Sequence, residues 1–254
     1  MNKDYYDFVC FTGLKRSGKD TSADLLIKQL DNAGVKYKRL MLADKLKEFL
    51  MNALNHSFVT RRLTMDDMNG DTDFDREENI KMGVSELDDI LRMFLGQIDK
   101  YLSDNNIDSL FNIRRSLAKN HILDEYESPV DNLMYISVRR MLQVFGTDIA
   151  RCDDNELWSK ITVDTAIRYS NDKGDIKYIL TDMRMDVEVE YIMHKGFKPL
   201  VVEIINRRTG EVPNHITDMG ISKPYIDYII DNDGSLEKLE TNVNKLNKDI
   251  LKWN

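Results

Sequence analysis

The sequence predicts an α/β fold in which a mostly parallel, five-stranded sheet is flanked by helices. Short apolar segments typical of buried strands alternate with segments whose apolar residues recur at helical spacing. A glycine-rich segment follows the first apolar strand directly and precedes a helix. Strands separated by helices favour parallel pairing with right-handed crossovers. At 254 residues the chain is long enough to bury a substantial core.

The first part of the chain is expected to form two strand–helix pairs. Residues 6–12 are an apolar strand segment, and the amphipathic segment after the glycine-rich residues ends at the Asn-Ala-Gly of 32–34. A second strand is expected at 37–43 and a second helix at 44–56.

The last third of the chain alternates in the same way. Strands are expected at 177–182, 198–205 and 225–231, and a helix that ends at a glycine is expected at 187–196. Ser235 is placed to cap a terminal helix.

The middle of the chain is polar and irregular. Helices are expected at 85–101 and 106–120, and a further helix begins at Ser137, which is a suitable N-cap. Another helix is expected at 155–169. We therefore expect a helical insertion at about 57–136.

The predicted organisation is one domain spanning 1–254, with a core of about 1–56 and 137–254. Ligands of parallel α/β sheets bind at the carboxyl ends of the strands. Four residues fall at that edge, namely Gly13, Ala43, Asp182 and Asn206. The insertion is expected to lie above the edge as a lid.

Composition narrows the classes of function. A net charge of −8 without basic runs disfavours a nucleic acid polymer as the main partner. Two cysteines, Cys10 and Cys152, are too few for a disulfide framework or a thiolate zinc site. No apolar run approaches the ~18 residues of a membrane span, and the N-terminal residues lack a signal-peptide pattern. We expect a cytoplasmic protein without membrane contact.

Residues 13–19 have the spacing G-x-x-x-x-G-K of a phosphate-binding loop. In such a loop, backbone N–H groups and the positive end of the following helix bind phosphate oxygens, and the lysine, here Lys19, reaches the terminal phosphates. The glycines allow the backbone to approach the phosphates closely. The alternative is an ordinary strand–turn–helix without a ligand, although the apolar strand before the loop and the helix after it favour the phosphate site.

Asp20 stands where a hydroxyl group usually contacts Mg²⁺. A carboxylate is also a hard oxygen ligand, so Asp20 can hold the metal directly or through water. Thr21 supplies a hydroxyl group for a phosphate oxygen. Alternatively, Asp20 only stabilises the first turn of the helix as an acidic residue.

Seven segments, in this order, resemble bacteriophage deoxynucleoside monophosphate kinases, a branch of the P-loop nucleoside monophosphate kinases. They are LKRSGKDTSAD, DFDREENI, VRRMLQVFGTD, LWSKI, TDMRMDVEVE, NHITDMGI and DNDGSLEKL. The resemblance covers about 8–56, 74–80 and 137–240, whereas residues 98–136 match nothing in it. The first segment is the most specific of the seven.

The resemblance implies a P-loop kinase fold and transfer of the ATP γ-phosphate to a deoxynucleoside 5′-monophosphate, for phage DNA precursor synthesis. It further implies Mg²⁺, a homodimer and the host cytoplasm. The insertion would bind the acceptor, form a lid or make a dimer contact. The ATP site would comprise Gly13, Lys15, Arg16, Ser17, Gly18, Lys19, Asp20 and Thr21, with Asn232 and Gly234 near the adenine.

Phosphoryl transfer depends mainly on positioning and charge neutralisation, so several cationic side chains must meet at one edge. Arg139 and Arg140 begin a helix and project roughly 100° apart, so they serve different contacts. By similarity, the acceptor site would comprise Lys47, Arg76, Arg139, Arg140, Gln143, Gly146, Thr147, Trp158, Asp182, Arg184 and Glu188. The residues expected to act at the reacting phosphates are Lys19, Arg16, Arg140 and Asp182.

Two of these assignments leave alternatives open. Trp158 lies beside apolar residues at helical spacing, so it is equally well read as a core residue. Asp182 ends a strand, where it can hold Mg²⁺ or its water, address the acceptor with Arg184, or cap the next helix.

Other readings are weaker. Six residues have the spacing of a calcium loop, namely Asp67, Asn69, Asp71, Asp73, Asp75 and Glu78, but Thr72 replaces the required glycine. His215 lies in a matching segment without an assigned role. Alternative functions are a kinase for another small phosphorylated metabolite, similar to dephospho-coenzyme A kinase, or a non-catalytic nucleotide-binding switch. The paired arginines disfavour a switch, which needs no second anion site.

Overall fold

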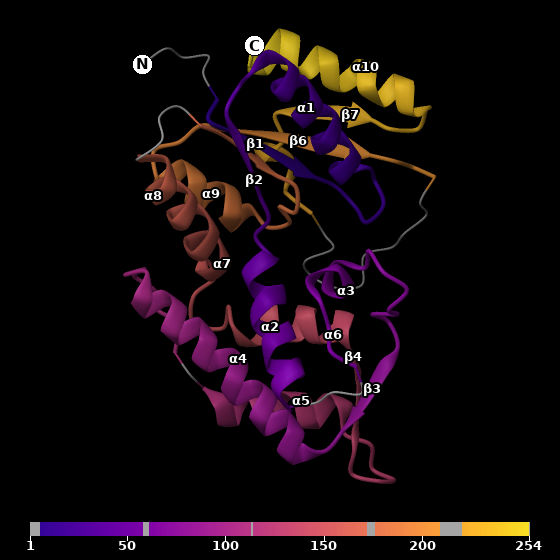
Figure 1. The fold of residues 1–254 in the computed structure, drawn as a ribbon, viewed down its shortest axis with the longest axis vertical. Helices are drawn as coiled ribbons and strands as arrows, with labels where there is room; N and C mark the ends of the chain where they lie inside the picture. The colour runs from indigo at the N-terminus through magenta and orange to yellow at the C-terminus, as the bar shows by residue number, and fades with distance from the viewer. Residues whose placement is uncertain (1–5, 58–60, 113, 172–175, 209–219, 254) are drawn as a thin grey trace. The chain divides into compact units, whose positions relative to one another are not determined.

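The computed structural model describes residues 6–57, 61–112, 114–171, 176–208 and 220–253 (Figure 1). The chain divides into two compact units. The sheet unit comprises 1–42 and 162–254, and the helical unit comprises 43–161. Each unit is described by itself.

The sheet unit is built on a five-stranded, fully parallel sheet in the order β2-β5-β1-β6-β7. The strands are β1 (Phe8–Thr12), β2 (Tyr37–Leu40), β5 (Lys177–Leu180), β6 (Pro199–Ile205) and β7 (Tyr228–Asp231). The predicted fold class, with its mostly parallel five-stranded sheet flanked by helices, is confirmed.

Helices cover both faces of this sheet. Helices α1 (Lys19–Ala33) and α10 (Leu236–Leu246) pack on one face, and α8 (Thr165–Asn171) and α9 (Asp186–His194) pack on the other (Figure 1). A 3₁₀ turn precedes β7 (Lys223–Tyr225), and a π-helical turn follows α10 (Asn247–Leu251). Since successive strand side chains point to opposite faces, each buried strand supplies side chains to the apolar cores on both faces of the sheet.

The central strand β1 shows this alternation. Val9 and Phe11 pack with α1 and α10, whereas Phe8 and Cys10 pack with α8 and α9. Phe8 stacks on Tyr178 of β5 with ring centroids 4.6 Å apart. A strand buried on both faces is apolar throughout, which explains why the sequence FVCFT carries no polar alternation.

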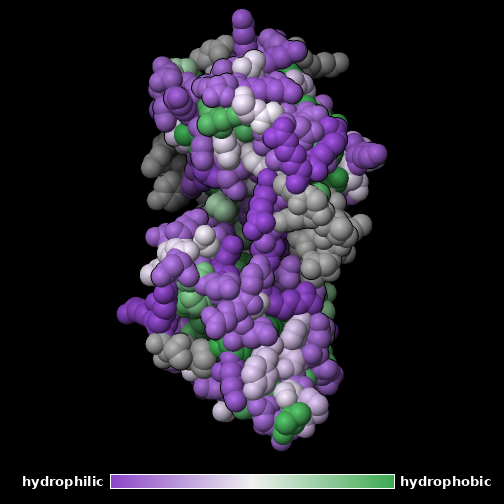
Figure 2. Space-filling model, turned by 90° about the vertical axis from the view of Figure 1, so that its right-hand side faces the viewer, coloured by the Kyte–Doolittle hydropathy of each residue, from purple (hydrophilic) through white to green (hydrophobic). Residues whose placement is uncertain are grey.

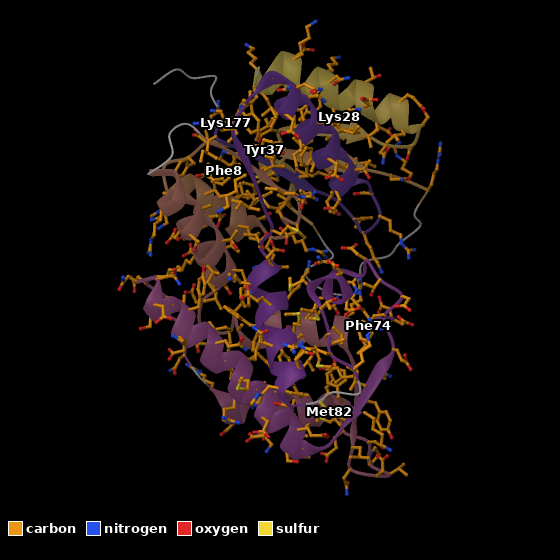
Figure 3. All side chains as sticks on the ribbon, in the orientation of Figure 1. Phe8, Lys28, Tyr37, Phe74, Met82 and Lys177 are labelled. Carbon is orange, nitrogen blue, oxygen red and sulfur yellow. The ribbon has the colours of Figure 1, made fainter. Side chains whose placement is uncertain are left out.

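A buried lysine begins β5. Lys177 pairs with Tyr37 of β2 in the sheet, and both lie at the same end of the sheet as Phe8 (Figure 3). Burial removes water from the Lys177 ammonium group and lowers its pKa to about 8. The ammonium nitrogen also lies 5.9 Å from the ring centre of Trp253 in the C-terminal segment.

The helical unit contains five α-helices of five residues or more within its described residues. They are α2 (Asp44–Ser57), α3 (Met65–Asn69), α4 (Val84–Asp104), α5 (Arg115–Tyr126) and α6 (Val138–Gln143). Strands β3 (Asn79–Met82) and β4 (Met134–Ser137) pair antiparallel. After α6 the chain forms a π-helical turn (Val144–Ile149), the short α7 (Leu157–Ser159) and a second π-helical turn (Lys160–Asp164).

The core of the helical unit joins these elements through one apolar cluster. Met82 of β3 is buried, and the partly buried Phe74 packs against the same cluster (Figure 3). Phe94 of α4 meets Phe145 with ring centroids 5.3 Å apart. The unit starts at residue 43 and ends at 161, so it is wider than the expected insertion at 57–136. That all 254 residues form a single kinase domain stays a prediction.

Several expected elements differ from the structure. The helix expected at 106–120 begins only at Arg115, and the helix expected at 155–169 is divided by a π-helical turn. The pair β3–β4 has no counterpart in the sequence reading. Four-residue strands whose partner lies far along the chain leave little periodicity to detect.

Polar side chains predominate on the face drawn in Figure 2, and apolar ones form separate small patches. Among the described residues, no helix combines the length and the apolar character that crossing a membrane requires.

Candidate functional site

The glycine-rich segment between β1 and α1 forms a tightly folded loop. Gly13, Arg16 and Gly18 all have positive φ values, of 135°, 60° and 101°. The ammonium group of Lys19 donates hydrogen bonds to the carbonyl oxygens of Gly13 and Leu14, at 2.8 and 2.7 Å. The lysine therefore folds back over the loop that precedes it.

Close packing explains both glycines of this loop. A Cβ atom on Gly13 would collide with the carbonyl oxygen of Ile204 at the end of β6. A Cβ atom on Gly18 would collide with the amide nitrogen of Asn232. That amide donates a hydrogen bond to the carbonyl oxygen of Ser17 at 2.8 Å, so the turn after β7 is attached directly to the loop.

The interior of the loop offers groups that suit a phosphate. The hydroxyl oxygen of Ser17 is buried and has no hydrogen-bond partner among the described residues. Lys19 is buried as well, whereas Arg16 and Thr21 are exposed and Lys15 is half-buried. A buried, unpartnered hydroxyl group is costly unless a ligand satisfies it, so the loop fits a bound phosphate.

Asp20 has a partner on the edge strand β2. Its carboxylate lies 2.8 Å from Nη2 of Arg39 on β2, and 68% of the side chain is exposed. The other terminal nitrogen of Arg39 binds Asp24, one turn further along α1, at 2.6 Å. Asp20 remains a hard oxygen ligand at the start of α1, and a metal ion would compete with Arg39 for it.

The residues after β5 are held by hydrogen bonds between side chains and the backbone. The Asp182 carboxylate accepts a hydrogen bond from the backbone N–H of Leu42 at 2.8 Å. Thr12 at the end of β1 donates to the carbonyl oxygen of Met183 at 3.0 Å. These bonds bring the segments after β1, β2 and β5 together at the carboxyl edge of the sheet.

The side chain of Glu188 stabilises the start of α9. It is buried, and its carboxylate accepts hydrogen bonds from the backbone N–H groups of Arg184 and Met185 at 2.8 and 3.2 Å. It therefore supplies the acidic side chain of a capping box at the start of α9. The alternative that Asp182 caps this helix is wrong, because the N-cap residue is Met185.

The turn after β7 is joined to the end of β6 by an arginine. Arg207 donates from its backbone to the Asp233 carboxylate at 2.7 Å, and its guanidinium binds Asp231 and Asp233 at 2.9 and 2.8 Å. Gly234 follows in the same turn, and Ser235 caps α10, as predicted, by accepting from the backbone N–H of Lys238 at 3.4 Å. Arg207 belongs to no motif recognised in the sequence.

In the helical unit, two of the expected acceptor-site arginines lie together. The backbone N–H of Arg139 donates to the carbonyl oxygen of Arg76 at 3.0 Å. Arg76 donates to the carbonyl oxygen of Met68 at 2.8 Å, and Arg139 pairs with Glu77 at 3.2 Å. Burial and the positive charge of Arg139 lower the pKa of Arg76. The positive charge of two neighbouring arginines favours an anionic ligand.

Lys47 and Arg140 make separate contacts in this unit. The Lys47 ammonium group donates to the side-chain oxygen of Asn69 at 2.8 Å. The Arg140 guanidinium donates to the hydroxyl group of Tyr126 at 2.5 Å, to the side-chain oxygen of Gln143 at 3.3 Å and to the Glu125 carboxylate at 3.1 Å. Both Tyr126 and Glu125 belong to α5, a helix to which no sequence motif assigned a function.

Trp158 supports the π-helical turn that carries Gly146 and Thr147. Its side chain is 2% exposed and belongs to the core of the helical unit, and its indole N–H donates to the carbonyl oxygen of Gly146 at 2.8 Å. Gly146 is buried and Thr147 half-buried. The reading of Trp158 as a core residue is confirmed, and contact with the acceptor stays a prediction. π-Helical turns are frequent at functional sites.

Asp67, the first residue of the calcium-like spacing, is buried and serves the fold. Its carboxylate accepts from the hydroxyl groups of Thr72 and Thr64 at 2.6 and 2.8 Å and pairs with Arg61. His215 lies outside the described residues.

No sequence motif marked four of the residues that contact these groups, namely Arg39, Arg207, Glu125 and Tyr126. Arg39 lies on the strand expected at 37–43, but its partners Asp20 and Asp24 are 19 and 15 residues away in sequence. The other three contact their partners across 14 or more residues of sequence or through loops.

Two curated relatives align over nearly the whole chain. The deoxynucleotide monophosphate kinase of Enterobacteria phage T4 is 30% identical over 247 residues, which span 91% of this chain and 94% of the relative. The enzyme of the same name from Escherichia phage RB69 is 27% identical over 251 residues, spanning 94% and 99%. The solved APS kinase CysC of Mycobacterium tuberculosis, in complex with AMPPNP and APS, is 13% identical at a TM-score of 0.35, covering 96% of this chain and 99% of that one. That likeness is too low to add to the argument.

The family model described as deoxynucleotide monophosphate kinase matches residues 7–243. The match includes the phosphate loop, the arginine-bearing elements of the helical unit and the turn after β7. The chain therefore belongs to the deoxynucleotide monophosphate kinase family.

Proposed function

We propose that this protein transfers the γ-phosphate of ATP to a deoxynucleoside 5′-monophosphate and releases ADP and the deoxynucleoside diphosphate. The family membership supports this activity. The phosphate loop carries the proposal, because its buried Ser17 hydroxyl has no partner among the described residues and lies beside the buried Lys19. Such a loop suits the polyphosphate of the donor nucleotide.

The acceptor phosphate requires a second cationic site. In the helical unit, the backbone N–H of Arg139 donates to the carbonyl oxygen of Arg76, and the positive charge of Arg139 acts on Arg76. Arg140 lies next in sequence. Arginine pairs suit phosphate because their N–H groups bind two oxygens at once. A nucleotide switch has no use for such a pair, so a transferase is the better reading.

The reaction is expected to use Mg²⁺ bound to ATP. Asp20 and Asp182 are the carboxylates that would hold the ion or its water, on the carboxyl side of β1 and β5. A bound Mg²⁺ neutralises charge on the phosphates. We propose further that the protein acts as a homodimer in the host cytoplasm and supplies phage DNA synthesis, by analogy with its phage relatives.

An ADP-release assay coupled to NADH oxidation tests the activity. The purified protein is incubated with Mg·ATP and each deoxynucleoside monophosphate in turn. Dephospho-coenzyme A and a reaction without acceptor serve as comparisons. We expect acceptor-dependent ADP release with at least one deoxynucleoside monophosphate and none with dephospho-coenzyme A.

Product analysis by anion-exchange chromatography separates transfer from hydrolysis. The expected product is the deoxynucleoside diphosphate in equal amount to ADP. If ADP forms at the same rate without acceptor, the protein is an ATPase and the proposed function is wrong. Size-exclusion chromatography with light scattering tests the homodimer.

A further inference from the structure

Helix α5 lies outside the seven motif segments of the sequence, yet it supplies two partners of Arg140. The Nε–H group of Arg140 donates to the hydroxyl oxygen of Tyr126, and Nη2 donates to the carboxylate of Glu125 at 3.1 Å. The Tyr126 hydroxyl in turn donates to the same Glu125 oxygen at 2.7 Å. Three side chains therefore close a ring of hydrogen bonds.

The ionisation states of Glu125 and Tyr126 allow both side chains to accept hydrogen bonds from Arg140. The hydrogen bond from Tyr126, followed by the contact with Arg140, holds the pKa of Glu125 below its usual range despite partial burial. Burial, together with Glu125, raises the pKa of Tyr126, so its phenol keeps the proton that it donates. A charged carboxylate and a neutral phenol are what a guanidinium group requires of its two partners.

The remaining hydrogens of the guanidinium define what else it can bind. Of the five N–H groups of an arginine, Arg140 uses Nε–H, one on Nη2 and one on Nη1, which donates to Gln143 at 3.3 Å. One N–H remains on each terminal nitrogen. Such a pair matches two oxygens of one phosphate group.

The two partners are attached to a rigid frame. Ala118 and Ile122 of α5 are buried in the core of the helical unit. The residue after α5, Glu127, forms an isolated antiparallel bridge with Met134 at the start of β4. β4 then leads directly into Ser137, which caps the helix that carries Arg140. Both ends of the contact are therefore tied together through backbone structure.

We propose that Tyr126 and Glu125 are positioning residues that orient the guanidinium of Arg140 towards the acceptor phosphate. This inference rests on the proposed function and extends it, because it makes α5 part of the acceptor site. Without its two partners, Arg140 loses the fixed orientation that leaves one N–H on each terminal nitrogen for the ligand. Acceptor binding then carries the cost of ordering a long side chain.

The test uses Tyr126→Phe and Glu125→Gln in the full-length protein, with the acceptor accepted best by the unaltered enzyme. We expect the KM for that acceptor to rise about tenfold, in keeping with loss of one charge-assisted hydrogen bond. The KM for ATP should stay within about twofold, and the melting temperature within a few degrees. Calorimetric titration with the monophosphate alone should show the same loss of affinity.

Tyr135→Phe is the matched control. The hydroxyl group of Tyr135 also donates to a carboxylate, that of Asp131, at 2.7 Å, but the three side chains to which the Arg140 guanidinium donates are Tyr126, Glu125 and Gln143. This variant should retain the acceptor KM. If it weakened acceptor binding as much as Tyr126→Phe does, the effect would be general and the positioning role would be wrong.

A double-mutant cycle that combines Tyr126→Phe with Arg140→Lys measures the coupling between Tyr126 and Arg140. If Tyr126 acts through Arg140, the double variant should bind the acceptor only slightly worse than Arg140→Lys alone. If the losses of acceptor affinity in the two single variants multiplied in the double variant, the proposal would be contradicted. An active enzyme whose Tyr126→Phe and Glu125→Gln variants keep the acceptor KM would overturn the positioning role and leave the kinase function standing. Absence of acceptor-dependent activity in the unaltered protein would instead overturn the function, and this inference with it.

Discussion

The carboxylate of Asp20 lies 2.8 Å from Nη2 of Arg39, although the position of Asp20 in the phosphate loop is one at which a side chain usually contacts a metal. Arg39 also binds Asp24 at 2.6 Å, so one guanidinium group holds two carboxylates on successive turns of α1. Two like charges four residues apart repel each other, and Arg39 offsets that repulsion. Asp20 thus has a defined protein partner in Arg39.

Replacing Asp20 separates a metal-binding role from a purely helical one. If the carboxylate binds Mg²⁺, Asp20→Ala should raise the Mg²⁺ concentration for half-maximal activity severalfold. Asp20→Ser should raise that concentration less, because a hydroxyl group can still contact the ion. Arg39→Ala should lower that concentration, because the competing cation is gone. Because exposed ion pairs contribute only about 0–1 kcal/mol, the melting temperature should change little.

Asp24→Ala is the control for that experiment, since Asp24 binds the same arginine one turn further from the loop. Its Mg²⁺ activation curve should match that of the unaltered protein. An unchanged curve for Asp20→Ala as well would assign Asp20 to the helix alone.

Lys19→Met should abolish most of the turnover. The ammonium group is buried in the loop, where it is expected to neutralise the terminal phosphates, and we expect a loss of roughly hundredfold or more in kcat. Steady-state kinetics with circular dichroism measures activity and folding together. Lys28→Met is the control, because Lys28 is exposed on the same helix (Figure 3). Near-normal turnover of Lys19→Met would contradict the assignment of the loop.

Gly18→Ala should weaken ATP binding. The new Cβ atom would displace the amide of Asn232, which holds the loop through the carbonyl oxygen of Ser17. The positive φ adds strain of about 1–2 kcal/mol. Gly34→Ala carries similar strain at φ 68° but meets nothing within 4 Å, so it should lower stability without changing the KM for ATP. Equal KM values in the two variants would show that the contact with Asn232 is dispensable.

Asp67→Asn should reduce stability in a pH-dependent way. The hydrogen bond from Thr72, with those from Thr64, lowers the pKa of this buried carboxyl group despite its burial. Its contribution is therefore present above its ordinary pKa of about 4 and is lost as the pH falls towards the lowered value. Urea unfolding at pH 7 should show a loss of about 2–3 kcal/mol.

At pH 3 the difference between the unaltered protein and Asp67→Asn should be smaller. Asp66→Asn is the control, because Asp66 is exposed in the same first turn of α3. The burial argument would be contradicted if Asp66→Asn cost as much stability as Asp67→Asn.

Trp158→Phe should affect both stability and the acceptor. Phenylalanine keeps an aromatic ring in the core but loses the hydrogen bond to Gly146, which costs about 1 kcal/mol. Because that bond holds the π-helical turn with Thr147, the acceptor KM should also rise severalfold. Trp253→Phe loses an equivalent bond to the carbonyl oxygen of Tyr6, in the sheet unit, and should change stability alone. A normal acceptor KM in Trp158→Phe would limit Trp158 to a role in the core.

Local patterns predicted the strands of the sheet unit and one helix cap in each unit correctly. The apolar strands, the loop spacing and the caps at Ser137 and Ser235 depend on residues within a few positions of each other, and all are found in the structure. The segment 98–136 was harder to interpret. Its helix α5 has no strong apolar face, and its partners lie on other elements.

The sequence by itself determined the strand–loop–helix motif, the parallel sheet and the types of residue needed for phosphate chemistry, because each follows from periodicity and short spacings. Only the tertiary structure decided which partner each charged side chain has. Arg39 binds Asp20, Glu188 caps α9 and Tyr126 holds Arg140. Except for the cap, these contacts join residues that are distant in sequence. A charged side chain takes whichever opposite charge the packing of the core brings within reach.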